Sequence, residues 1–394
     1  MNDPPSDVAV RCAYSPTMKH RVRWLLLALV ASGIGAAASM TSRVSGSVDP
    51  AVFEPAAVSF ISPAKGWVLG RAGCQDCAAI RATTDGGHHW AALPPPGVPL
   101  GYYSRSSGAV NDLVFVDQVN GFLFAPGLLT THDGGRSWRR QSLPPVQQVS
   151  VGAGYVFALT RATGTKGHAA LWRTPIGQDR WKRLPLPAAA ASAPRMSVFT
   201  LELAVEVAEV ALLQPGFNGP QVAPNLVGRI WSSSDLGASW RARSVPCTTA
   251  DGGAAILAIA RAHPHSWLID CFDNEQSSQE QDTQHHLYRS ADAGASWMRV
   301  SDPTRHNMPA LLADNGAGHA FLTTEGVSDT LVGSFDGGHH WRLLLRSGGS
   351  FSGWADLRFL TAKIGFVIGP THYSPEHLYR TDDGGRTWQI LRAE

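Results

Sequence analysis

Charged residues are scarce in this sequence, and neither sign dominates. Lys and Arg number 33 and Asp and Glu 31 among 394 residues, so charged residues make up 16% and the formal net charge is +2 at pH 7. A nucleic-acid partner calls for a basic excess, which excludes nucleic acid from the expected partners. Gly 40, Pro 26 and Trp 13 are high by contrast, with 44% hydrophobic residues. This composition is typical of short strands joined by many turns.

Long apolar runs are also rare, and the clearest one lies near the N-terminus. Basic residues at positions 19–23 precede an uncharged run at 24–40. The layout predicts either a cleaved signal peptide or a retained membrane anchor, and both alternatives stay open. The positive charges predict a cytoplasmic segment 1–23, then a linker 41–51 and an extracytoplasmic domain 52–394. The domain is therefore expected to be secreted or anchored to the cell membrane by one N-terminal helix.

Cysteine is sparse, with five residues in the whole chain. Cys12 precedes the apolar run, which leaves four on the predicted oxidising side. We expect Cys74 to pair with Cys77 and Cys247 with Cys271 as structural disulfides. A redox or metal site at "CQDC" is the alternative, but redox dithiols usually open a helix and zinc would need a second ligand pair nearby.

One short phrase recurs along the chain: a hydroxyl residue, an Asp two positions later, glycine, and a Trp five positions after the Asp. It reads "TTDGGHHW" near the start and "TDDGGRTW" near the end. A seventh, degenerate copy keeps Thr174 and Trp181 but has Ile176 at the Asp position. Copies about 43 to 59 residues apart fit a four-stranded unit. The six full copies contain Asp85 and Trp90, Asp133 and Trp138, Asp235 and Trp240, Asp292 and Trp297, Asp336 and Trp341, and Asp383 and Trp388.

The chemistry of the phrase predicts a structural hairpin. An Asp carboxylate accepts hydrogen bonds from backbone N–H groups further along a turn, and the glycine suits a positive φ. The Trp supplies a large apolar face with one N–H to satisfy. A second element, such as "VSFISPAKGWVLG" or "ADLRFLTAKIGFVIG", precedes the phrase and predicts two strands joined by a short turn.

The pattern S/T-x-D-x-G-x-S/T-W resembles the Asp-box, or bacterial neuraminidase repeat, of β-propellers. The resemblance implies an all-β, seven-bladed β-propeller over residues 52–394 around a central channel. The second element resembles phrases of the photosystem II stability and assembly factor family, within the sialidase-like superfamily. Because the last copy ends on an outer strand, either the first blade is complete by itself or residues near 48–55 lend a strand elsewhere.

Sialidase activity is disfavoured by what the sequence lacks. The sialidase family places an arginine in an F/Y-R-I-P phrase ahead of its first box, and the closest string here is "KRLP" at Arg183, where a strand ends. Another glycoside hydrolase would need two carboxylates at one cleft. Asp112 and Asp356 are the catalytic candidates, because they hold the same position in their units. The alternative is that each caps its own strand. Histidine pairs in exposed hairpins give no metal site, and no cofactor is expected.

Exposed rings in irregular loops are the expected contact surfaces. Tyr102, Tyr103 and Arg105 lie in a Pro/Gly loop, and Trp354 with Arg358 opens the last unit. Such rings anchor partners or sugars, or they fold back over the protein. The sequence thus predicts a non-enzymatic binding or assembly scaffold in the cell envelope, with an unidentified protein or glycan partner. The alternative is a carbohydrate-active protein, either a glycan binder or a non-sialidase glycoside hydrolase.

Overall fold

The computed structural model divides the chain into two units, residues 1–47 and 48–394. The residues it describes all belong to the second unit, so the predicted signal or anchor at 24–40 lies outside them. No helix within them is long and apolar enough to cross a membrane. The described residues are 52–74, 76–101, 108–160, 169–187, 202–206, 209–214, 229–247, 254–259, 265–272, 285–303, 308–326, 329–346, 353–369 and 377–393.

These residues form seven four-stranded sheets, each built from four strands that follow one another in the chain. Neighbouring strands within every sheet are antiparallel, as in the pairing of Val58 with Val68. The sheets comprise β1 (Glu54–Phe60), β2 (Gly66–Arg71), β3 (Ala78–Thr83) and β4 (Ala91–Ala92); β5 (Asp112–Phe115), β6 (Gly121–Phe124), β7 (Leu128–Thr131) and β8 (Arg139–Arg140); β9 (Val146–Gly152), β10 (Tyr155–Thr160), β11 (Ala170–Pro175) and β12 (Lys182–Leu184); β13 (Glu202–Glu206), β14 (Glu209–Gln214), β15 (Arg229–Ser233) and β16 (Arg241–Arg243); β17 (Ala254–Ile259), β18 (Trp267–Phe272), β19 (His285–Ser290) and β20 (Met298–Arg299); β21 (Met308–Asp314), β22 (Ala320–Glu325), β23 (Thr330–Ser334) and β24 (Trp341–Arg346); and β25 (Asp356–Phe359), β26 (Gly365–Gly369), β27 (His377–Thr381) and β28 (Gln389–Leu391).

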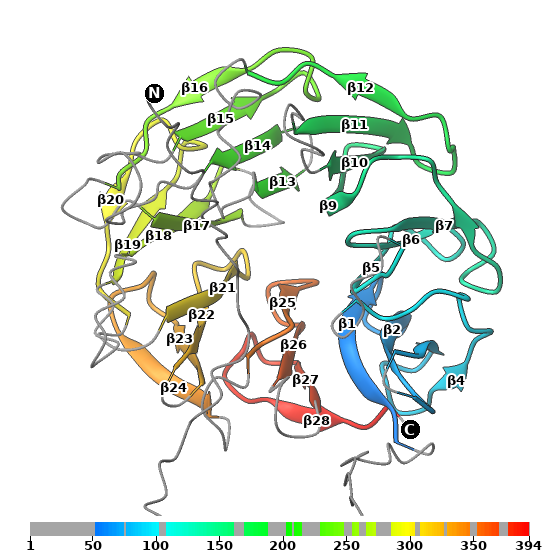
Figure 1. Cartoon of the computed structure of the whole chain (residues 1–394). Coiled ribbons are helices and arrows are strands. Elements are labelled where there is room, and N and C mark those ends of the chain that lie inside the picture. Colours follow the sequence, from blue (N-terminus) through cyan, green and yellow to red (C-terminus); the bar gives the residue numbers. More distant parts are fainter. Residues whose placement is uncertain are drawn as a thin grey trace, which may run out of the picture. The chain divides into compact units, whose positions relative to one another are not determined.

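Within this unit the sheets follow one another around a centre, and the first strand of each sheet lies innermost (Figure 1). Most sheets contact the next through these inner strands, the second and third sheets meet through β6 and β9, and β1 contacts both β5 and the β25–β27 strands. The ring therefore closes between the first and last sheets, although they share no strand. Of the two closures expected from the sequence, the structure has the self-contained first sheet. The predicted all-β class and four-stranded units are confirmed, and residues 48–394 complete every described sheet without residues 1–47.

Aromatic stacking between sheets explains the second sequence element. The Trp67 ring stacks on Phe115 with centroids 3.7 Å apart, and Phe60 stacks on Phe366 at 4.1 Å. The glycine that opens β2, β6 and β26 leaves room for the phenylalanine that ends the first strand of the same sheet: a Cβ added at Gly66 would lie 2.5 Å from the Phe60 ring. Phe-x(5)-Gly is therefore a packing requirement, because any side chain at the glycine would displace the stacked ring.

Candidate functional site

The repeated phrase forms a hairpin between the third and fourth strands, held by one hydrogen-bond pattern. In the first copy, Thr83 Oγ1 donates to Asp85 Oδ1 at 2.8 Å and accepts from Gly87 N at 2.9 Å. Asp85 Oδ1 also accepts from His89 N at 3.0 Å. The His89 backbone N–H is the largest cause that holds the pKa of Asp85 below its usual value. The same hydroxyl–Asp–backbone pattern recurs at Asp133, Asp235, Asp292, Asp336 and Asp383.

The box tryptophans differ in what their indole N–H groups reach. Trp90 Nε1 donates to Gly87 O within its own hairpin, at 3.0 Å. Trp240 Nε1 instead reaches Pro185 O, just after β12, at 2.8 Å, and Trp297 Nε1 reaches Ser244 O, just after β16, at 2.9 Å. The hairpins thus bind neighbouring sheets to one another. In the degenerate copy there is no Asp carboxylate to accept from the backbone of the turn. Thr174 Oγ1 accepts from Arg180 N instead, at 3.2 Å.

The two candidate acids and one candidate arginine meet where the ring closes. Asp112 begins β5, and Asp356 and Arg358 lie on β25, with β1 between these strands. Arg358 Nε donates to Asp356 Oδ1 at 2.7 Å, and Arg358 Nη2 donates to Asp112 Oδ1 at 3.4 Å. The guanidinium therefore bridges two carboxylates that stand 244 positions apart in the chain.

The backbone of β1 takes part in the same cluster. Val58 N donates to Asp356 Oδ2 at 3.1 Å, so this carboxylate accepts from a backbone N–H of the neighbouring sheet. Asp112 Oδ1 accepts from Leu113 N at 2.6 Å, which is the local capping arrangement. On the other side of β1, Ser59 Oγ accepts from Phe115 N at 2.8 Å. We call Asp112, Asp356, Arg358 and Val58 N the seam cluster.

The seam cluster is electrostatically coupled. Burial raises the pKa of Asp112 to about 6; the Arg358 charge opposes this shift and the Asp356 charge adds to it. Burial disfavours the guanidinium charge, but the two carboxylates outweigh it and raise the pKa of Arg358 above its ordinary value. The Asp112 and Arg358 side chains are each 35% exposed, whereas Asp356 is 6% exposed. The cluster can therefore present one weakly acidic carboxyl beside a fixed cation.

Of the other predicted contact residues, the structure describes Trp354, which does not join the seam cluster. Trp354 is only 7% exposed, and its Nε1 donates to Thr324 O at 3.3 Å, so this ring folds back onto the protein instead of forming a contact surface. Tyr102, Tyr103 and Arg105 lie outside the described residues. A group of three or more side chains able to hold a metal does not occur in the part of the chain that the structure describes.

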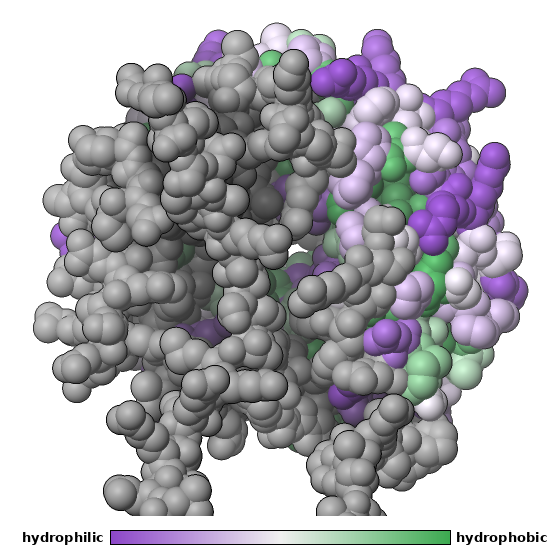
Figure 2. All heavy atoms as spheres, in the orientation of Figure 1, coloured by the Kyte–Doolittle hydropathy of each residue, from purple (hydrophilic) through white to green (hydrophobic). Residues whose placement is uncertain are grey.

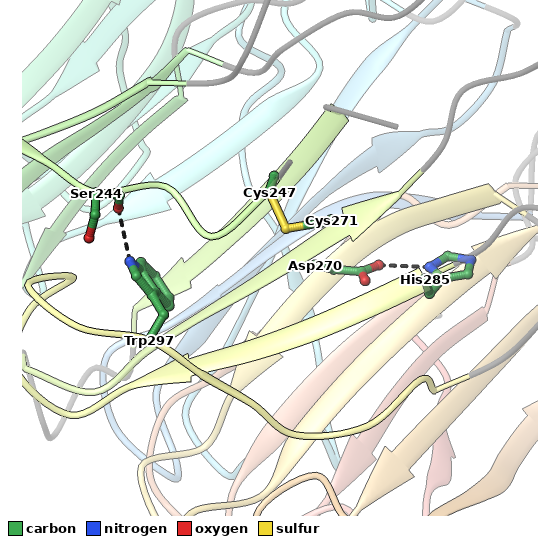
Figure 3. The surroundings of a disulfide bond; sticks show 6 residues. All are labelled: Ser244, Cys247, Asp270, Cys271, His285 and Trp297. Atoms are coloured by element: carbon green, nitrogen blue, oxygen red, sulfur yellow. Dashed lines mark hydrogen bonds and ion pairs between the residues drawn. A yellow bond between two sulfur atoms is a disulfide. The ribbon is translucent and has the colours of Figure 1, made fainter. Parts of the chain in front are cut away.

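Both cysteine pairs are bonded in the structure, Cys74 to Cys77 and Cys247 to Cys271. Cys247 follows β16 and Cys271 lies in β18, so the second disulfide joins two neighbouring sheets, close to the Trp297–Ser244 hydrogen bond (Figure 3).

A buried His–Asp pair near this disulfide was not anticipated from the sequence. His285 Nδ1 lies 2.8 Å from Asp270 Oδ2, and both side chains are fully buried (Figure 3). The signal was available, since Asp270 is the one charged residue in the apolar strand "WLIDCF" and pairs across from Leu287. A charge inside such a strand needs a partner, but the sequence does not say which residue supplies it.

Comparisons with known proteins agree on the architecture. No family model matches the chain, and no curated protein matches it either. Among solved structures it is similar to YCF48 bound to a D1 peptide, at 19% identity and TM-score 0.54, covering 84% of this chain and 94% of that one. YCF48 from Cyanidioschyzon merolae matches at 15% identity and TM-score 0.53, covering 86% and 95%.

A third similar structure is the β-propeller domain of the Trilobed protease from Pyrococcus furiosus, described by its authors as having an open velcro topology. It matches at 9% identity and TM-score 0.55, covering 86% of this chain and 98% of that one. The fold is that of a β-propeller. The likeness to YCF48 agrees with the propeller architecture that the second sequence element predicts. At these identities the likeness concerns the fold, and function must be argued from the residues of this propeller itself.

Proposed function

We propose that this β-propeller is a seven-bladed binding and assembly scaffold of the cell envelope, and that it has no enzymatic activity. The chain is exported and is either secreted or tethered to the cell membrane through residues 24–40, with residues 52–394 outside. Its partner is a protein segment. A similar propeller, YCF48, has been solved with a D1 peptide bound, and this supports a peptide as the class of partner.

The observation that carries the proposal is the state of the two candidate acids. Arg358 binds both Asp112 and Asp356, and backbone N–H groups of Leu113 and Val58 take up further lone pairs. Acid/base catalysis requires carboxyl groups within reach of the substrate's reacting atoms. These carboxyl groups are instead used to join three strands. The hairpin aspartates are used in the same way, by their own turns.

A glycoside hydrolase remains the second candidate because of one specific observation. Asp112 has a pKa raised to about 6 and lies beside a second carboxylate on the same guanidinium. Carboxyl pairs whose environments separate their pKa values are typical of acid/base assignments in glycosidases.

The two candidates predict opposite results in one experiment. The purified chain is assayed for glycan binding and turnover, and in parallel the intact cell is treated with a crosslinker and protein adducts are identified. The scaffold proposal predicts a specific protein adduct and no turnover. Turnover that disappears in Asp112→Asn or Asp356→Asn, while both variants keep the thermal stability of the parent, would refute it and establish the hydrolase.

Export is tested separately, by protease accessibility in intact cells. The outer layers of the cell are opened while the cytoplasmic membrane stays sealed, and protease is added from outside. We expect the protease to digest residues 52–394. Protection of this segment until the cytoplasmic membrane is lysed would overturn the predicted location.

A further inference from the structure

The outermost strands of three consecutive sheets carry most of the exposed positive charge of the propeller edge. In β8, β12 and β16, six of the eight residues are Arg or Lys: Arg139, Arg140, Lys182, Arg183, Arg241 and Arg243. Five of these six side chains are exposed, and Arg243 is half-buried. We call these six residues the basic arc. Figure 2 shows hydrophilic side chains projecting along the upper right margin, where Figure 1 places β12.

Four of the six charges of the basic arc are not neutralised within the described part of the chain. Arg139, Lys182, Arg183 and Arg241 have no carboxylate there within ion-pair distance. The aspartates of the adjoining hairpins are committed elsewhere: Asp133 accepts from Ser137 and Asp235 accepts from Ser239. Four cations of the arc, Arg139, Lys182, Arg183 and Arg241, thus face solvent over three neighbouring sheets with no ion-pair partner among the described residues.

Protection of sheet edges does not account for this distribution. Lys and Arg on edge strands prevent pairing with other chains, and that need is the same for every outermost strand. Yet β4 and β28 contain no basic residue, and β20 and β24 together have three among eight residues. Outer strands outside the arc instead expose Met298, Leu343 and Ile390. The charge is thus concentrated on one side of the edge.

We propose that the basic arc is a docking surface for an anionic lipid bilayer, bound through the phosphate headgroups. The inference rests on the proposed membrane tethering. Linker residues 41–51 span at most about 40 Å when fully extended, so a tethered propeller stays within that reach of the headgroups. The cations stand on three neighbouring outer strands and do not converge on one point, so they suit an extended anionic surface better than a single small ligand. The attraction acts over about a Debye length, roughly 10 Å at moderate salt.

Vesicle binding by residues 48–394 tests the proposal, because this unit completes its own sheets and lacks the apolar run. The unit is mixed with phosphatidylcholine vesicles, with or without phosphatidylglycerol, and bound protein is measured by flotation. We expect binding to the phosphatidylglycerol vesicles alone, weakening as NaCl is raised. Arg139→Gln, Lys182→Gln and Arg241→Gln together should weaken it by roughly tenfold or more.

A matched control removes three exposed charges from the last two sheets: Arg346→Gln on β24, Lys363→Gln in the turn between β25 and β26, and Arg392→Gln just after β28. Less than about a threefold change is expected from it. Equal losses in the two triple variants, or equal binding to neutral and anionic vesicles, would overturn the proposal. So would binding to an acidic polysaccharide such as heparin without binding to vesicles, which would assign the arc to a soluble polyanion. If the triple variant fails to fold, the single charge reversal Arg139→Glu answers the same question.

The vesicles contain neither protein nor glycan, so this result is independent of the crosslinking and turnover assays. Vesicle binding without a protein adduct would refute the scaffold proposal alone, and an adduct without vesicle binding would refute the arc alone.

Discussion

Replacement of Arg358 by Met should weaken the closure of the propeller ring by a measurable amount. Loss of one partner from a fully buried ion pair costs about 3–5 kcal/mol, whereas exposed pairs contribute about 0–1 kcal/mol. Asp356 is 6% exposed and Arg358 35% exposed, so the pair lies between these limits. We expect the free energy of unfolding to fall by about 2–3 kcal/mol. With an unfolding entropy of about 2.1 cal/mol/K per residue, Tm should fall by about 3–4 °C.

The assay is urea and thermal unfolding of residues 48–394 at neutral pH. Arg346→Met is the control, since Arg346 is exposed on β24 and has no ion-pair partner among the described residues; it should change stability by less than about 0.5 kcal/mol. Adding Asp356→Asn to Arg358→Met should recover much of the loss, because the uncompensated charge is gone while the amide oxygen still accepts from Val58 N. A loss no larger than in the control, or no recovery in the double variant, would refute the ion-pair account of the seam.

Three further predictions concern other parts of the molecule. Asp112 has a folded pKa of about 6 against an ordinary 3.8, so the folded state holds an extra proton between these values and the parent loses stability as pH rises through this window. The free energy of unfolding of Asp112→Asn should therefore rise relative to that of the parent by about 1 kcal/mol from pH about 4 to 7, after discount for solvent screening. A difference in urea unfolding that does not change with pH would contradict this. Gly385 has a φ of +89°, and Gly385→Ala places a methyl group against the Phe321 ring, so it should lower the free energy of unfolding by about 3 kcal/mol. Gly318 also has a positive φ but open space around it, so Gly318→Ala should cost about 1 kcal/mol. Equal costs in thermal unfolding would show that the ring contact is unimportant. Replacement of Cys247–Cys271 by two serines should cost roughly 3 kcal/mol for a separation of 24 residues, and unchanged urea unfolding would show that the link does not constrain the unfolded chain.

The repeat made the fold predictable because its signals are local. A hydroxyl, an Asp and a glycine within five positions determine one hairpin, whatever lies elsewhere in the chain. Thr174 illustrates the strength of this signal: the hydroxyl still organises its turn after the Asp has been replaced by Ile176. The spacing of the copies then gave the four-stranded unit, and the Phe-x(5)-Gly element gave the first two strands of several sheets.

The seam cluster was predictable only in part. Equivalent positions in two units pointed to Asp112 and Asp356, but not to the guanidinium that bridges them. Whether an inner-strand carboxylate faces solvent, its own strand or a neighbouring sheet depends on contacts between residues some 245 to 298 positions apart. Trp354 shows the same limit, because a ring at the start of a strand can point outward or pack inward with equal local propensity. Tertiary packing, not local pattern, decides both.

The seam has a consequence for how activity measurements on this propeller should be interpreted. Hairpins and aromatic stacks join one sheet to the next around the ring, and the first and last sheets have their own stack of Phe60 on Phe366. Charged side chains add to the closure there: Arg358 binds Asp112 of β5, Asp356 binds Val58 N of β1, and Arg380 Nη1 donates to Gly86 O at 2.7 Å in the first hairpin. The residues that most resemble a catalytic pair therefore also help to close the ring. A loss of binding or turnover in Asp112 or Asp356 variants identifies a functional site only if the stability of the ring is unchanged. The charge-neutral Asn variants keep an oxygen that can accept from Leu113 N and Val58 N, so they are the variants that can separate a loss of function from a loss of ring stability.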